Sequence, residues 1–146
     1  MIAPSSGLQN GYSVITLSAR DGTDIADATS LLLTLVGCET NTGATWYQYP
    51  NTAVSFPPRS GMNITLKGDW GAGPVKVEGI GATVILPFPA SQVRVWPLTA
   101  SGARQANEIA VYPTDAADAG LGVAIGLAKF TVSSAFSTLW YEIEVN

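Results

Sequence analysis

The chain has 146 residues, of which 47% are hydrophobic and 12% are charged, and its net charge is −4. This length allows one domain with a substantial core. Nucleic acid is disfavoured as a partner because no basic stripe would displace counterions from phosphates, and a membrane is disfavoured because no apolar run reaches the length of a span. Histidine is absent, which removes the commonest general base and most transition-metal sites.

Short alternating segments predict the fold class. Residues 14–19 place Ile15 and Leu17 on one face, and residues 30–39 form a longer apolar strand that we expect to be buried on both faces for part of its length. Further strands are predicted at 63–67, 75–78, 82–86, 92–98, 104–112 and 122–132. We therefore predict an all-β antiparallel β-sandwich, jelly-roll-like or immunoglobulin-like, with about nine or ten strands and no amphipathic helix.

The domain boundaries follow from composition. Residues 1–11 are small and polar, and are predicted to be a linker remnant. Residues 12–146 are predicted to form a single β-sandwich domain. No basic segment with an apolar continuation follows Met1, so no signal peptide is visible. A domain cut from a longer secreted chain would look the same, and we expect this explanation.

The closing segment, T-L-W-Y-E-I-E-V at 138–145, predicts a half-buried strand. Its apolar face carries Leu139, Tyr141, Ile143 and Val145. The opposite face carries Thr138, Trp140, Glu142 and Glu144. Carboxylates do not enter a core unpaired, so the second face is predicted to meet solvent.

Residues 41–61 interrupt the strand pattern with aromatic residues and prolines, which predicts an edge or loop. Pyranose rings present flat C–H faces that pack on aromatic rings, while amides and arginines meet the hydroxyl groups. The candidate carbohydrate-binding residues of this segment are Trp46, Tyr47, Gln48, Tyr49 and Arg59. The alternative is that Trp46 plugs the core and the tyrosines cover a sheet edge.

Two further tryptophans are candidate binding residues. Trp70 lies in a glycine-rich turn, where folding back over the core is favoured over display. Trp96 occupies the non-core face of the strand at 92–98 and forms an aromatic patch with Trp140 if the two strands are neighbours. Such a patch is either a sugar platform or a contact surface for a catalytic domain.

The carboxylates do not predict catalysis. Glu142 and Glu144, with Glu78 or Asp69, imitate a glycosidase pair only if they face each other across a cleft, so we expect solvated strand glutamates. Cys38 is the only cysteine, and its apolar surroundings predict a buried, unreactive thiol.

No cofactor is expected. The aspartates that offer oxygen ligands are Asp21, Asp24, Asp27, Asp115 and Asp118. Their spacing does not match the EF-hand loop, so ordinary turn aspartates are predicted, with a structural calcium as the alternative.

Several stretches together resemble a known family. In order they are I-T-L-S-A-R-D-G (15–22), L-L-L-T-L-V-G-C-E-T-N-T-G (31–43), W-G-A-G-P-V-K-V-E-G-I-G-A-T-V (70–84), V-R-V-W-P-L-T-A-S-G-A-R (93–104) and T-L-W-Y-E-I (138–143). They resemble the C-terminal β-sandwich accessory domains of bacterial glycoside hydrolases. Residues 47–61 are longer and more aromatic than that pattern.

The resemblance implies a non-catalytic module, secreted as part of a larger enzyme. We predict that it binds a plant cell-wall polysaccharide of the β-glucan type through exposed aromatic residues. The alternative is a structural domain that packs against the catalytic barrel of its parent enzyme and binds no sugar. A phage or surface-protein sandwich fits the composition but not the motif stretches.

Overall fold

The computed structural model describes residues 1–4, 13–22, 24–48, 52–54 and 63–146. These residues form thirteen strands, three single-turn 3₁₀ helices and one short α-helix. The strands are β1 (Ile2–Pro4), β2 (Val14–Ala19), β3 (Ser30–Val36), β4 (Glu39–Thr42), β5 (Trp46–Gln48), β6 (Thr52–Val54), β7 (Ile64–Thr65), β8 (Ala72–Val77), β9 (Ala82–Pro89), β10 (Val93–Pro97), β11 (Tyr112–Pro113), β12 (Leu127–Val132) and β13 (Trp140–Val145). The helices are η1 (Ile25–Asp27), η2 (Ala90–Gln92), α1 (Ala116–Ala119) and η3 (Ser134–Phe136).

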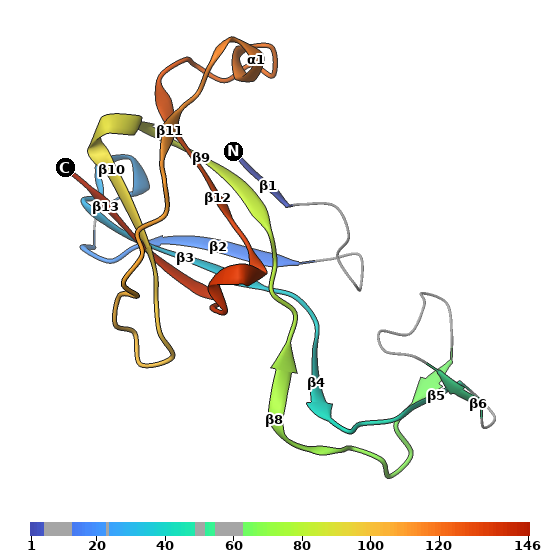
Figure 1. Cartoon of the computed structure of the whole chain (residues 1–146). Coiled ribbons are helices and arrows are strands. Elements are labelled where there is room, and N and C mark those ends of the chain that lie inside the picture. Colours follow the sequence, from blue (N-terminus) through green and yellow to red (C-terminus); the bar gives the residue numbers. More distant parts are fainter. Residues whose placement is uncertain (5–12, 23, 49–51, 55–62) are drawn as a thin grey trace.

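Two four-stranded antiparallel sheets form the body of the molecule (Figure 1). One sheet has the strand order β1-β9-β12-β11 and the other has the order β10-β13-β3-β2. Their facing side chains make one hydrophobic cluster, to which β3, β9 and β12 contribute most. This confirms the prediction of an all-β sandwich, with more and shorter strands than the sequence indicated.

The closing strand β13 has the predicted register. Tyr141 and Ile143 are 1% and 0% exposed, whereas Trp140 is 39% exposed. β13 lies between β10 and β3 and pairs with both along its length. Alternation alone predicts this register, because a slip of one residue would bury Glu142 and Glu144.

An arm leaves one end of the sandwich. β4 continues β3 and β8 leads into β9, and the two strands pair with each other outside the body (Figure 1). At its tip lies a small sheet with the order β6-β5-β7. All six residues of β8 are exposed. The arm is therefore held mainly by its own hydrogen bonds and by its root.

Small residues allow the two strands to converge at the root of the arm. A Cβ atom on Gly37 would lie 2.6 Å from the side chains of both Glu78 and Ile80. The Glu78 carboxylate accepts hydrogen bonds from the backbone nitrogen of Cys38 at 3.2 Å and from its sulfur at 3.1 Å. Cys38 is buried as predicted, and desolvation, followed by contact with Glu78, raises its pKa to about 11. The thiol therefore stays protonated.

Four sequence predictions differ from the structure. Residues 2–4, assigned to a linker remnant, form β1, because they complete the edge of β9. Residues 104–112 are not one strand: Ile109 bridges to β10 of one sheet before β11 joins the other. Of residues 122–132, only β12 is a strand. β3 alternates buried with half-buried residues and so is not buried on both faces.

The short helix α1 was not predicted. Its N-terminus is a capping box, in which the Asp115 side chain accepts from the backbone nitrogen of Asp118 and the Asp118 side chain accepts from that of Asp115. No helix in the described part of the chain is long and apolar enough to cross a membrane.

Replacing Tyr141 with alanine should lower the free energy of unfolding by about 3–5 kcal/mol, because it empties a fully packed site. Trp140→Ala removes a ring of similar size from the adjacent position, which is partly exposed, and should cost clearly less. Urea denaturation of both variants measures the difference. Equal losses would contradict the register of β13.

Candidate functional site

Two tryptophans predicted as binding residues border one cavity on the arm. The cavity has a volume of about 240 Å³. It is lined by Glu39, Thr40, Asn41, Ala44, Trp46, Leu66, Trp70 and Val75. The two indoles are 24 positions apart in sequence (70 − 46) and come from different elements, β5 and the turn before β8. The fold therefore brings an aromatic pair together with a carboxylate and an amide.

Trp70 is held at the cavity by its main chain. The side-chain nitrogen of Asn41 donates to the carbonyl oxygen of Trp70 at 2.9 Å, and the backbone nitrogen of Thr45 donates to Asp69 O at 3.0 Å. Gly71 has φ +67°, and a Cβ there would clash with Thr42 O and lie 2.5 Å from Ala44 N. The turn thus packs directly on residues 42–45. The expectation that Trp70 folds back over the core is wrong, because it is 61% exposed.

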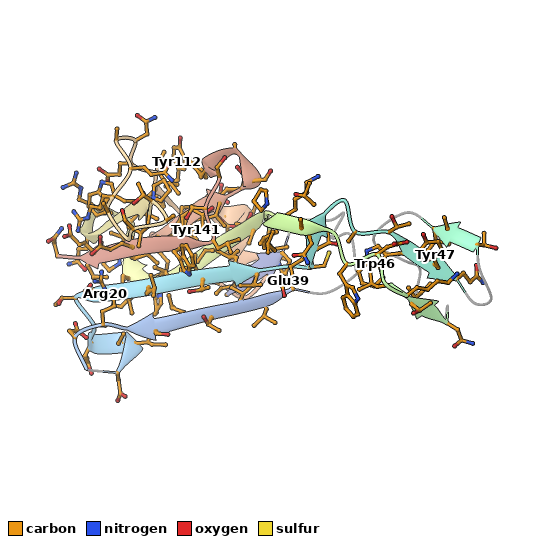
Figure 2. All side chains as sticks on the ribbon, turned by 90° about the horizontal axis from the view of Figure 1, so that it is seen from below. Arg20, Glu39, Trp46, Tyr47, Tyr112 and Tyr141 are labelled. Atoms are coloured by element: carbon orange, nitrogen blue, oxygen red, sulfur yellow. The ribbon has the colours of Figure 1, made fainter. Side chains whose placement is uncertain are left out.

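Trp46 projects from β5, the central strand of the tip sheet. Its neighbour Tyr47 points to the opposite face, as strand alternation requires. There Lys67 Nζ lies 4.4 Å from the Tyr47 ring centroid, and the Tyr47 hydroxyl donates to Asp69 (Figure 2 labels Trp46 and Tyr47). That hydrogen bond is the main cause of a raised Tyr47 pKa. One face of the Tyr47 ring is therefore already occupied.

None of the three remaining predicted residues is placed at the cavity by the described structure. Gln48 lies in β5, opposite Thr52 and Ile64, and does not line the cavity. Tyr49 and Arg59 lie outside the described residues, and their predicted roles stay predictions.

Trp96 is far from the arm cavity and is covered. It lies on β10, paired with Glu142 of β13, and is only 7% exposed. The guanidinium carbons of Arg104 and Arg94 lie 3.8 and 4.7 Å from its ring centroid. The ring is already engaged in two cation–π contacts. Trp96 therefore does not offer the open face that a sugar platform needs.

The glutamates beside Trp96 are more than solvated strand residues. Glu142 accepts from Arg20 at 2.7 Å and from Arg104 at 2.8 Å, and its side chain is 16% exposed. Arg104 also pairs with Glu144. The hydrogen bond from Arg104 is the main cause that lowers the pKa of Glu142. These charges compensate one another.

Two of the candidate calcium ligands, Asp21 and Asp118, have protein partners. Asp21 accepts from the backbone nitrogen and hydroxyl of Thr29 at 2.7 and 3.0 Å. Asp118 pairs with Lys129 at 2.6 Å, beside the capping box. No group of three or more metal-binding side chains occurs within the described ranges.

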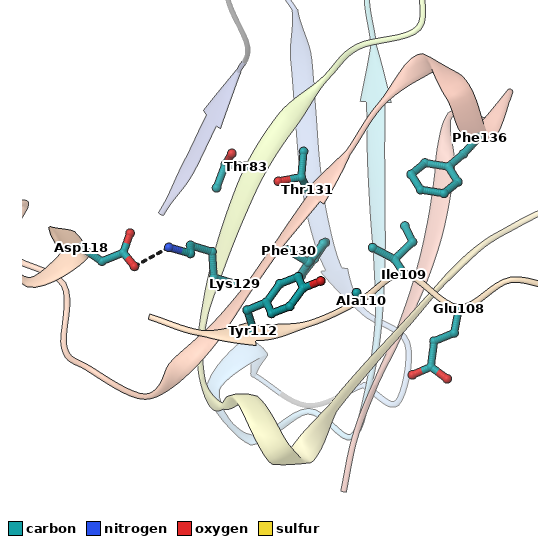
Figure 3. A pocket seen from close by; sticks show the side chains of 10 residues that line it. All are labelled: Thr83, Glu108, Ile109, Ala110, Tyr112, Asp118, Lys129, Phe130, Thr131 and Phe136. Atoms are coloured by element: carbon teal, nitrogen blue, oxygen red, sulfur yellow. Dashed lines mark hydrogen bonds and ion pairs between the residues drawn. The ribbon is translucent and has the colours of Figure 1, made fainter. Parts of the chain in front are cut away.

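A larger cavity of about 490 Å³ lies at the β11 side of the sandwich (Figure 3). Tyr112, which is 61% exposed, stands over it, and the Lys129–Asp118 pair lies at one end. That pair raises the pKa of Lys129 and lowers the pKa of Asp118 through their shared hydrogen bond. The charges here are matched, and none of the predicted binding residues lines this cavity.

Sequence reasoning missed Glu39, Thr40 and Asn41 as lining residues. A signal was present, since E-T-N-T at 39–42 is a polar strand directly before the aromatic segment. Its relation to Trp70 was not visible because the pairing of β4 with β8 joins residues 30 or more positions apart.

No family model, curated protein or solved structure has a significant match to this chain. The resemblance to accessory domains of glycoside hydrolases therefore stays a prediction.

The close packing of Gly71 gives a direct test of the site geometry. Gly71→Ala should displace the turn, since a non-glycine residue at this φ costs about 1–3 kcal/mol even without the clash. The indole N–H resonances of Trp46 and Trp70 should shift in NMR spectra, while those of Trp96 and Trp140 stay in place. Gly68→Ala is the matched control, because its Cβ would meet nothing within 4 Å. Equal shifts in both variants would contradict the role of Gly71.

The Glu142 network predicts a pH dependence of stability. Because the folded pKa lies below the ordinary 4.5, the pairing contributes fully above that pH and is lost as pH falls through the lower value. Glu142→Gln should therefore cost about 1 kcal/mol at neutral pH, near the upper end for such pairs. The difference in unfolding free energy between the unmodified protein and Glu142→Gln, measured by urea denaturation, should disappear in acid. A difference in unfolding free energy that grows as pH falls would contradict the lowered pKa of Glu142.

Proposed function

We propose that this chain is a non-catalytic carbohydrate-binding module that takes a β-linked polysaccharide of the β-glucan type at the arm cavity. The observation that carries the proposal is the pairing of Trp46 and Trp70 around one hollow with Glu39 and Asn41. Indole faces receive the C–H faces of a pyranose, and the polar side chains meet its hydroxyl groups.

The size and position of the cavity favour a polymer over a small ligand. Its volume of about 240 Å³ is below the roughly 300–1,000 Å³ typical of drug-sized ligand sites. The arm projects from the sandwich, and Trp70 is 61% exposed. A long chain can therefore lay one ring in the hollow while its neighbours continue past the arm.

Several features favour binding without hydrolysis. Glycoside hydrolysis uses two carboxyl groups on either side of the scissile bond. Glu39 is the only carboxylate among the described lining residues of the cavity. Soluble polysaccharide should therefore be bound unchanged, and the parent enzyme would supply the catalytic domain in a secreted chain.

A second candidate function is docking to a protein, such as the catalytic domain of a parent enzyme. Val75 and Val77 of β8 are 54% and 39% exposed. They border a cavity of about 590 Å³ that also includes Leu139 and Ser134. Arginines cover Trp96, so the predicted Trp96 contact surface is not open to a catalytic domain. The cavity bordered by Val75 and Val77 would serve as the docking surface instead.

The test is the affinity of tryptophan variants for polysaccharide. Trp46→Ala and Trp70→Ala should each weaken binding by about 1–3 kcal/mol, as is common for central aromatic anchors. The parent domain is first run by affinity electrophoresis against soluble glucans, xylans and mannans, and the best ligand is then titrated by calorimetry. Binding should survive moderate salt, because stacking involves no ion pair.

Trp140→Ala is the matched control, since Trp140 is 39% exposed but lies on the sandwich. Circular dichroism confirms that each variant is folded. Loss of binding in Trp140→Ala, with none in the arm variants, would move the site to the sandwich. Failure of the parent domain to bind any polysaccharide would leave the docking function.

A further inference from the structure

Glu39 has an uncompensated charge at the edge of the arm cavity. It shares one face of β4 with Asn41, because they are two positions apart. Lys76, the cation on the paired strand, is opposite Thr40 and so lies on the other face. No salt bridge joins Glu39 to a cation within the described part of the chain.

The other carboxylates near aromatic residues have protein partners, and Asp69 accepts from the Tyr47 hydroxyl. Glu142 and Glu144, beside Trp96, are paired with arginines, and Glu108 pairs with Arg94 at 2.6 Å. The arm cavity is lined by two tryptophans together with Glu39, which forms no salt bridge with a described residue. An aromatic pair with a negative group is the combination that attracts an organic cation, because the ring face and the carboxylate both favour positive charge.

We propose that the cavity prefers a β-linked glucan in which the 2-hydroxyl groups are replaced by free amino groups. This inference rests on the proposed carbohydrate-binding function and names its substrate class. In a β-linked 2-amino-2-deoxyglucose unit the amino group is equatorial, at the rim of the ring. The C–H face can pack on one indole while the ammonium group donates to Glu39 and lies near the other indole.

The test compares three soluble oligosaccharides of equal length and β-1,4 linkage, built from glucosamine, N-acetylglucosamine or glucose. They are titrated by calorimetry into the parent domain, Glu39→Gln and Asp27→Asn. The pH is mildly acidic, so that the amino groups of the glucosamine oligomer are protonated. Asp27→Asn removes the same charge from η1 on the sandwich, and so controls for attraction of a polycation to the negative protein.

The parent domain should bind the glucosamine oligomer about three- to tenfold more tightly than the other two, as expected for one cation–π contact with one exposed ion pair. Glu39→Gln should abolish this preference, and it should weaken binding of the glucosamine oligomer more than binding of the glucose oligomer. Asp27→Asn should retain the preference.

Equal or weaker binding of the glucosamine oligomer by the parent domain would overturn the proposed preference but not the carbohydrate-binding function. So would a loss of preference in Asp27→Asn as large as in Glu39→Gln, because the attraction would then follow net charge. A matching loss of affinity for glucose in Glu39→Gln would show that Glu39 shapes the cavity without selecting charge. Failure of all three oligomers to bind would overturn both proposals.

Discussion

The arm depends on the closure of two sheets at one end of the sandwich. Facing sheets are about 10 Å apart where side chains fill the space between them, whereas paired strands are about 4.8 Å apart. β3 and β9 belong to opposite sheets, yet their continuations β4 and β8 pair with each other. Gly37 makes this possible, because a side chain there would collide with Glu78 and Ile80. The cavity on the arm thus depends on a contact between residues that do not line it.

A ribbon of two strands has little stability of its own in water. The arm therefore needs additional side-chain hydrogen bonds along its length. Glu78 accepts from Cys38 at the root, the Thr42 hydroxyl donates to Pro74 O at 2.7 Å further along, and Asn41 donates to Trp70 O near the tip. The last of these also positions a lining residue of the cavity. Polar side chains of β4 therefore stabilise the arm and shape the site together.

The sequence predicts those parts of the fold in which one strand alone carries the information. β13 and β2 alternate cleanly, so the faces that they turn to the core follow from periodicity. The segment 104–112 also has strand character, but it crosses from one sheet to the other, and periodicity cannot show that. Trp46 was found as a candidate from its aromatic surroundings. The exposure of Trp70 was not, because it is set by Asn41 and by the backbone at residues 42–45, which are distant in sequence.

Glutamates in this protein meet two different electrostatic environments on the same kind of scaffold. Glu142 stands on a strand next to Trp96, where Arg20 and Arg104 neutralise it and Arg104 also lies over the ring. Glu39 also stands on a strand and shares a cavity with two tryptophans, but it forms no salt bridge with a described residue. An exposed carboxylate costs little when water solvates it, so stability does not demand a partner there. In the first arrangement arginines cover the Trp96 ring, whereas in the second Trp70 stays exposed and shares its cavity with a carboxylate.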